Sequence, residues 1–140
     1  MKKRLLIDLN VVLDVLLDRE PHAAAGAGLW AVIERQAAVG FLPAHGLTTI
    51  HYLVQCARGT RFARQTIVDL LSVFRVAAVG EGILRRALEL SWPHFEDAVC
   101  AACAVASRCH AIVTRDPGGF GGAALPVIDP AAAVAWLGGR

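Results

Sequence analysis

The sequence lacks the features that mark membrane and secreted proteins. Its longest uninterrupted apolar run covers residues 98–106, far fewer than the ~20 residues that a membrane-spanning helix needs. The first residues are basic and apolar like a signal peptide, but Asp8 and Asp14 interrupt them and no small-residue cleavage site follows. We therefore expect a cytoplasmic protein with no membrane partner.

The sequence also has little net charge and few aromatic side chains. The formal net charge is only +2, so it neither supports nor excludes an RNA substrate, because nucleic-acid binding usually leaves a stronger basic footprint. Aromatic residues make up 6% of the chain, which gives no evident platform for base stacking.

The four cysteines do not indicate a disulfide framework. Cys100, Cys103 and Cys109 lie within ten residues of one another, and nothing else indicates secretion, so we expect free thiols. Cys100 and Cys103 form a C-x-x-C, followed by Cys109 and His110, which raises the alternative of a zinc site. The alanine-rich run around them favours a helix with cysteines on its buried side, because zinc knuckles place this spacing on a tight turn.

Short apolar runs alternate with helix-length segments along the whole chain. Strands are expected at residues 4–9, 39–43, 74–79, 111–114 and 125–128. Helices are expected at residues 11–17, 23–36, 48–58, 62–72, 82–90, 96–108 and from 129 onward. Continuously apolar strands that alternate with helices indicate a parallel sheet covered on both faces. We predict one domain over residues 1–140, a three-layer α/β/α sandwich with a central, mainly parallel five-stranded sheet.

This fold would bring distant carboxylates to one edge of the sheet. Asp8 lies at the end of the first expected strand, Glu96 and Asp97 open the helix that leads into the fourth, and Asp116 follows the fourth. In right-handed βαβ units the strand ends and the starts of the following helices share that edge, where ligands bind. Carboxylates that repel one another are costly unless cations neutralise them, and hard divalent ions prefer oxygen ligands. The sequence therefore predicts a divalent-cation site.

Four segments in order resemble the PIN domain, over essentially the whole chain and with the spacing of small stand-alone PIN proteins. They are "LLIDLNVVLDVLLDREP", "FEDAV", "IVTRDPGGF" and "LPVIDPAAAVAWL". The resemblance implies a Mg²⁺- or Mn²⁺-dependent ribonuclease, commonly the toxin of a VapBC-type toxin–antitoxin pair. It also implies an RNA substrate, an antitoxin partner and a homodimer.

The resemblance assigns roles to particular residues. Asp8 is similar to the family's first metal-binding acid, Asp97 to the acid that opens the helix before the fourth strand, and Asp116 to a further acid. Asn10 matches a small polar residue after the first acid, and Thr114 the hydroxyl residue before the last. These acids would hold a cation that polarises a phosphoryl oxygen, activates a water and stabilises the leaving oxygen.

Simpler interpretations exist for several of these residues. Asp97 suits a helix N-terminus through the macrodipole, and Asp116 before Pro117 suits a turn. Asn10 orients Asp8 or caps the first helix, two compatible hypotheses. Asp129 before Pro130 is expected to be a plain N-cap.

Glu96 and Asp14 are two further candidates for supporting groups of the site. Glu96 points about 100° away from Asp97 around the helix, so only one of them is expected to ligate the ion, and we favour Asp97. Asp14 lies one to two turns into the first helix, from where it either reaches the rim or has no site role.

One part of the family pattern is missing. Many PIN nucleases carry a glutamate early in the third helix, where this chain has Ile50 and His51, with no acid from Gly40 to Gln65. About three carboxylates remain, enough for one ion and doubtful for a tightly held pair. His51 and Tyr52 are either RNA contacts, with His51 also a possible nitrogen ligand, or ordinary packed and surface side chains.

Arg58, Arg61 and Arg64 are either a phosphate-binding patch or, as is more usual, a solvated helix face.

Two other functions compete with the nuclease hypothesis. The missing acid keeps open a catalytically weak or inactive PIN-like module that binds RNA or protein. An aspartate-dependent phosphotransferase is disfavoured, because the first strand ends "DLN" without a second acid and no lysine follows the fourth strand.

Overall fold

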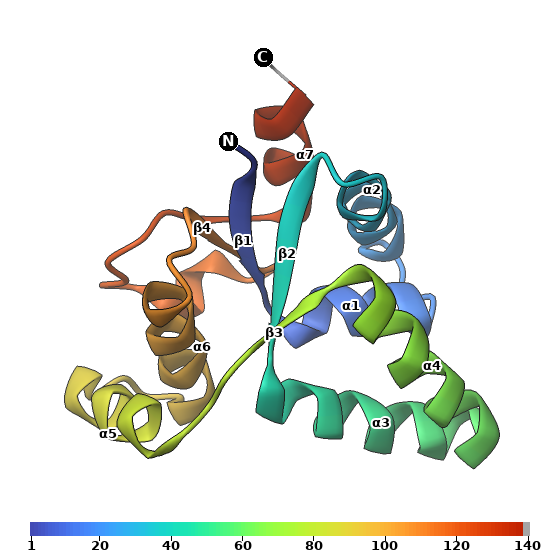
Figure 1. Ribbon diagram of the computed structural model, residues 1–140, viewed down its shortest axis with the longest axis horizontal. Coiled ribbons are helices and arrows are strands. Elements are labelled where there is room, and N and C mark those ends of the chain that lie inside the picture. Colours follow the sequence, from blue (N-terminus) through green and yellow to red (C-terminus); the bar gives the residue numbers. More distant parts are fainter. Residues whose placement is uncertain (139–140) are drawn as a thin grey trace.

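The computed structural model describes residues 1–138 as a central sheet flanked by helices (Figure 1). Its elements, in chain order, are β1 (Lys3–Ile7), α1 (Leu9–Leu16), α2 (Ala23–Glu34), β2 (Ala38–Pro43), α3 (Ala44–Arg58), α4 (Thr60–Val73), β3 (Arg75–Ala77), α5 (Glu81–Leu90), α6 (Phe95–Ala106), β4 (Ala111–Val113), the 3-10 turn η1 (Pro117–Phe120), β5 (Val127–Ile128) and α7 (Pro130–Gly138). No helix within these residues is long and apolar enough to cross a lipid bilayer.

The five strands form one sheet in the order β3-β2-β1-β4-β5, and every pairing is parallel. Leu5 of β1 is in register with Gly40 of β2 on one side and with Ala111 of β4 on the other. The first strand of the chain is therefore the central strand, between β2 and β4. This arrangement confirms the predicted α/β/α sandwich. The sheet was expected to be mainly parallel, and it is entirely parallel.

Alternate side chains of β1 pack in two separate hydrophobic cores, one on each face of the sheet. Leu5 and Ile7 belong to the core that β1 shares with α1, α2, α3, α4 and α7, whereas Leu6 packs with α5, α6 and η1 on the other face. All three are 0–1% exposed, so β1 is buried on both faces, as a continuously apolar strand requires. Figure 1 shows α5 and α6 on one side of the sheet and α1 to α4 on the other.

The carboxyl ends of the strands define the edge that carries the polar residues of interest. Helices α1 and α3 begin there, directly after β1 and β2. Helix α6 also begins there, because it runs back along the sheet to reach the start of β4. The start of β1 and helix α7 lie at the opposite end of the sheet (Figure 1).

The expected boundaries at the first strand and the third helix are wrong. β1 ends at Ile7 and α1 begins at Leu9, so Leu9 is helical and not part of the strand. α3 begins at Ala44, four residues before the expected Thr48. Pro43 ends β2 in an extended conformation and is the N-cap residue of α3, so the helix follows the strand directly.

The other predicted elements are present with smaller differences at their ends. β3 and β5 are shorter than expected, and α6 ends at Ala106, after which Arg108 adopts a positive φ of 57°. The turn suggested after Asp116 is the 3-10 turn η1.

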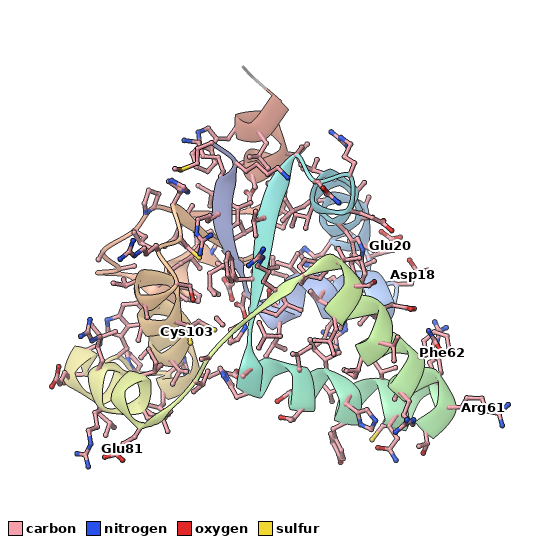
Figure 2. The ribbon with its side chains drawn as sticks, in the orientation of Figure 1. Asp18, Glu20, Arg61, Phe62, Glu81 and Cys103 are labelled. Carbon is pink, nitrogen blue, oxygen red and sulfur yellow. The ribbon has the colours of Figure 1, made fainter. Side chains whose placement is uncertain are left out.

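The cysteines are free thiols, as expected. Cys100, Cys103 and Cys109 are buried in the core between the sheet and α6, and Figure 2 shows Cys103 on the inner side of its helix. Burial raises the pKa of Cys103 and of Cys109 to about 11. Their environment is therefore that of protonated core side chains, and the zinc alternative finds no ligand group within residues 1–138.

Candidate active site

Asp8 is the buried centre of the polar rim. It directly follows β1, where its backbone N–H donates to the Val113 carbonyl at 2.9 Å, and its own carbonyl accepts from Val11 N at 3.0 Å. The side chain is held by Thr114, whose hydroxyl donates to Asp8 Oδ2 at 2.9 Å. Asp8 is 8% exposed and Thr114 0%, so this hydrogen bond is shielded from water. The strand pairing of β1 with β4 thus fixes the Asp8 carboxylate in the rim.

The surroundings of Asp8 disfavour its negative charge. Burial is the largest cause that raises the pKa of Asp8 above its ordinary 3.8, and the nearby carboxylates of Asp97 and Glu96 raise it further. The Thr114 hydroxyl and a hydrogen bond from the Leu9 backbone lower the pKa, but they do not compensate fully. A buried carboxylate with two acidic neighbours is a group that a cation would stabilise.

Asp97 comes to the same rim from the first turn of α6. Burial raises the pKa of Asp97 as well, and Glu96 and Asp116 add repulsion, whereas His94 lowers the pKa. A Cβ built on Gly119 would lie 3.0 Å from Asp97 Oδ2, so the Asp97 carboxylate lies against the backbone of η1. The glycine at position 119 leaves the space that this carboxylate uses.

Asp116 is exposed at the start of η1. Its backbone N–H donates to Thr114 Oγ1 at 3.2 Å, and its carbonyl accepts from Gly119 N at 3.2 Å. The Thr114 hydroxyl therefore links the Asp8 side chain to the backbone of Asp116. The turn chemistry expected after Asp116 is present, alongside the charge interaction of Asp116 with Asp97.

The three aspartates share one rim, but they are not gathered into a complete ligand set. Asp97 acts electrostatically on Asp8, and Asp116 acts on Asp97. Within residues 1–138, no group of three or more His, Cys, Asp or Glu side chains is close enough to hold a metal ion by itself. Mg²⁺ commonly binds through one or two carboxylates and completes its shell with waters and substrate phosphates. The oxygen donors of Asp8 and Asp97 fit that mode of binding.

Glu96, which precedes Asp97 in the first turn of α6, lies near His45. The distance from His45 Nε2 to Glu96 Oε2 is 3.8 Å. Both ring nitrogens of His45 are buried without a hydrogen-bond partner, although the ring as a whole is partly exposed. His45 lies in the first turn of α3, so it joins the rim from a third helix.

Sequence reasoning missed His45 and placed the start of α3 near His51 instead. The available signal was Pro43, which ends β2 in an extended conformation and directly precedes the helix. His51 is half-buried in the middle of α3, and the neighbouring Tyr52 is 64% exposed.

Asn10 does not cap the first helix. Asp8 occupies the N-cap position and Asn10 is the second helical residue, so the capping hypothesis is wrong. The Asn10 Oδ1 atom is buried without a hydrogen-bond partner, which leaves one free acceptor in the first turn after Asp8.

Asp14 is 1% exposed and pairs with two arginines. Arg115 Nε lies 3.4 Å from Asp14 Oδ2, and an Arg19 guanidinium nitrogen lies 3.8 Å from Asp14 Oδ1. Two cations therefore lie near this carboxylate, although its Oδ1 is buried without a hydrogen-bond partner.

The remaining candidates lie away from the acidic rim. Figure 2 shows Arg61 and Phe62 at the outer end of the α3–α4 hairpin, and the Arg58 guanidinium lies over the Phe62 ring at 5.3 Å. Asp129 is the expected N-cap of α7, since its Oδ1 accepts from Ala132 N at 2.8 Å.

The fold and the rim together define a class of protein: an all-parallel α/β domain with acids at the carboxyl edge of its sheet. A family model of the PIN domain matches residues 4–117, and the chain belongs to the PIN domain family. No curated protein matches the sequence.

Solved structures of similar fold come from toxin–antitoxin systems. Mycobacterium tuberculosis VapC20, a Sarcin-Ricin loop cleaving toxin, is 18% identical with a TM-score of 0.63, over 77% of this chain and 86% of that one. A Klebsiella pneumoniae toxin–antitoxin complex is 18% identical with a TM-score of 0.67, over 89% and 96%. DNA-bound VapBC from Salmonella typhimurium is 14% identical with a TM-score of 0.68, over 93% and 99%. At these identities the likeness demonstrates the fold.

Proposed function

We propose that the protein is a metal-dependent endoribonuclease and the VapC-like toxin of a toxin–antitoxin pair. One observation carries the proposal: Asp8 and Asp97, far apart in sequence, lie on one rim where burial raises the pKa of both. Asp97 adds repulsion at Asp8, and Glu96 and Asp116 add it at Asp97. Such a site is destabilised when empty and ionised, and perturbed carboxylates of this kind concentrate at functional sites.

Asp8 and Asp97 would hold a Mg²⁺ or Mn²⁺ ion, with Asp116 close by. When bound, the ion supplies charge stabilisation at the phosphoryl group and a water of lowered pKa. The chain's own residues prepare for this: Thr114 orients the Asp8 carboxylate, and Gly119 leaves room for that of Asp97.

The family supports the partners that we propose. VapC20 is a Sarcin-Ricin loop cleaving toxin, and another structure of this fold is a toxin–antitoxin complex. By extension, we assign to this chain an RNA substrate, a cognate antitoxin and a homodimeric state in the cytoplasm.

A second function has an observation in its favour. The described residues lack a three-ligand group, and α3 contains no acid that would complete one. A PIN-like module that binds RNA or protein without cleaving it is consistent with this geometry.

Cleavage of structured and unstructured RNA, with and without Mn²⁺ or Mg²⁺, tests the proposal. We expect metal-dependent cleavage that Asp97→Asn abolishes and that Asp18→Asn leaves intact, since Asp18 is exposed and lies outside the rim (Figure 2). RNA binding that needs no metal and is unchanged by Asp97→Asn, without cleavage, would support the binding module instead.

A further inference from the structure

Arg115 lies between two residues of the proposed site but turns its side chain elsewhere. Thr114 and Asp116 face the rim, whereas the Arg115 guanidinium reaches α1 and lies 3.4 Å from Asp14 Oδ2. The Asp14 side chain is 2% exposed and that of Arg115 is 32% exposed. The pair is therefore mostly removed from water, where an ion pair is screened little.

The segment 114–116 is thus attached to the start and to the last turn of α1. Thr114 bonds to Asp8 at the N-cap, and Arg115 pairs with Asp14 six residues further along the helix. The Thr114 backbone is also held, since its N–H donates to the Ile128 carbonyl at 3.0 Å. The pairing of Arg115 with Asp14 adds an attachment beyond the strand, next to Asp116, whose amide donates to Thr114 Oγ1.

We propose that Arg115 and Asp14 are positioning residues, a clamp that holds Thr114 and Asp116 in register with Asp8. The inference rests on the proposed metal-dependent function, because the clamp matters to activity only if the rim binds a cation. Groups that orient ligands from outside typically contribute about 10–100-fold to metal affinity or activity.

Arg19 provides a matched control for the clamp. It also pairs with Asp14, at 3.8 Å, but it belongs to the loop after α1 and adjoins none of the rim residues. Removing either arginine leaves the buried Asp14 carboxylate short of one cation, which is destabilising. Only the loss of Arg115 also releases the segment that carries Asp116.

The experiment compares Arg115→Met and Arg19→Met in three measurements on the full chain. These are amide hydrogen exchange at Asp116 and Asp8 without metal, Mn²⁺ affinity by electron paramagnetic resonance, and kcat and KM for RNA cleavage. We expect Arg115→Met to speed exchange at Asp116, to weaken Mn²⁺ binding about tenfold and to lower kcat more than it changes KM. Arg115→Lys should restore part of each loss. Arg19→Met should lower thermal stability while all three measurements stay at wild-type values.

The double variant Asp14→Asn/Arg115→Met keeps the proposal testable if Arg115→Met does not fold. It removes both buried charges together, so stability should recover while exchange at Asp116 stays fast and Mn²⁺ binding stays weak. Wild-type exchange and affinity in this double variant would overturn the clamp, as would equal effects of Arg115→Met and Arg19→Met. A wild-type protein that neither binds Mn²⁺ nor cleaves RNA would refute the proposed function, whereas amide exchange would still decide whether the clamp exists.

Discussion

The hydroxyl of Thr114 and the carboxylate of Asp8 meet at 2.9 Å although 106 positions separate them in the chain. The same hydroxyl oxygen accepts the amide of Asp116. The buried Thr114 side chain, directly after β4, therefore connects Asp8 and Asp116, two of the three proposed site acids, by hydrogen bonds. Its removal is the most direct test of how the rim is held.

Replacing Thr114 with valine should perturb Asp8 without changing the shape of the core. Valine keeps the branched form but removes the donor to a buried carboxylate, a hydrogen bond that contributes about 2 kcal/mol when one partner is charged. We expect lower stability at neutral pH, a pKa of Asp8 raised further, and weaker Mn²⁺ binding. Denaturant unfolding and an NMR titration of Asp8 measure these effects.

Thr114→Ser retains the hydroxyl and is the control. It should keep the pKa of Asp8 close to that of the wild type while losing one buried methyl group. A serine variant with the same pKa of Asp8 as the valine variant would contradict the role of the hydroxyl.

Replacing Asp8 with asparagine should stabilise the metal-free protein at neutral pH and abolish metal-dependent cleavage. Burial and the repulsion from Asp97 disfavour the charged form of Asp8, so a neutral isostere relieves both. The amide oxygen can still accept from Thr114. Thermal unfolding at pH 7 together with an RNA cleavage assay measures the two effects. A less stable Asp8→Asn protein would show that the charge of Asp8 is compensated within the chain.

The stability of the metal-free protein should depend on pH through Asp8 and Asp97. Both have a folded-state pKa above the ordinary 3.8, so the folded protein binds more protons than the unfolded chain between 3.8 and the raised values. The free energy of unfolding contributed by these groups therefore falls as pH rises through that window, and remains low above it. Unfolding curves from pH 4 to 7 should show a smaller fall for Asp8→Asn than for the wild type.

Gly119→Ala should disturb the site with little effect on the fold. The new Cβ would lie 3.0 Å from Asp97 Oδ2, which must move. We expect weaker Mn²⁺ binding, about tenfold as for other perturbations of ligand orientation. Gly118→Ala is the matched control in the same turn, because a Cβ there meets nothing within 4 Å. Equal Mn²⁺ affinities of the two variants would argue against Asp97 as a ligand.

Mn²⁺ should stabilise the wild-type protein against unfolding. A ligand that binds only the folded state adds about 2.7 kcal/mol at a concentration one hundred times its Kd. Thermal shift assays with increasing Mn²⁺ measure this gain, which Asp97→Asn should remove. A gain that persists in Asp97→Asn would place the bound ion elsewhere.

The order of strands and helices was predictable because β1, β2 and β4 are continuously apolar, and such strands belong to a sheet that is buried on both faces. The meeting of Asp8, Asp97 and Asp116 on one rim followed from the same topology. The start of α3 was predicted four residues too late, because the glycine at position 46 has a weak helix propensity and Pro43, the N-cap residue, was not used as a start signal.

The finer relationships within the rim depend on contacts between residues that are distant in sequence. The contact of His45 with Glu96 follows from the early start of α3. The pairing of Asp14 with Arg115 joins residues 101 positions apart, and no spacing within either segment indicates it. Asn10 was assigned a capping role because the first helix was expected to begin two residues later than it does.

The position of β1 between β2 and β4 also has a consequence for synthesis on the ribosome. Until β4 has emerged, the Asp8 edge of β1 has neither its neighbouring strand nor the Thr114 hydroxyl. A nascent or prematurely terminated chain that stops before residue 111 therefore lacks the assembled rim. The surroundings of Asp8 are therefore complete only after β4 and Thr114 have been synthesised and have paired with β1.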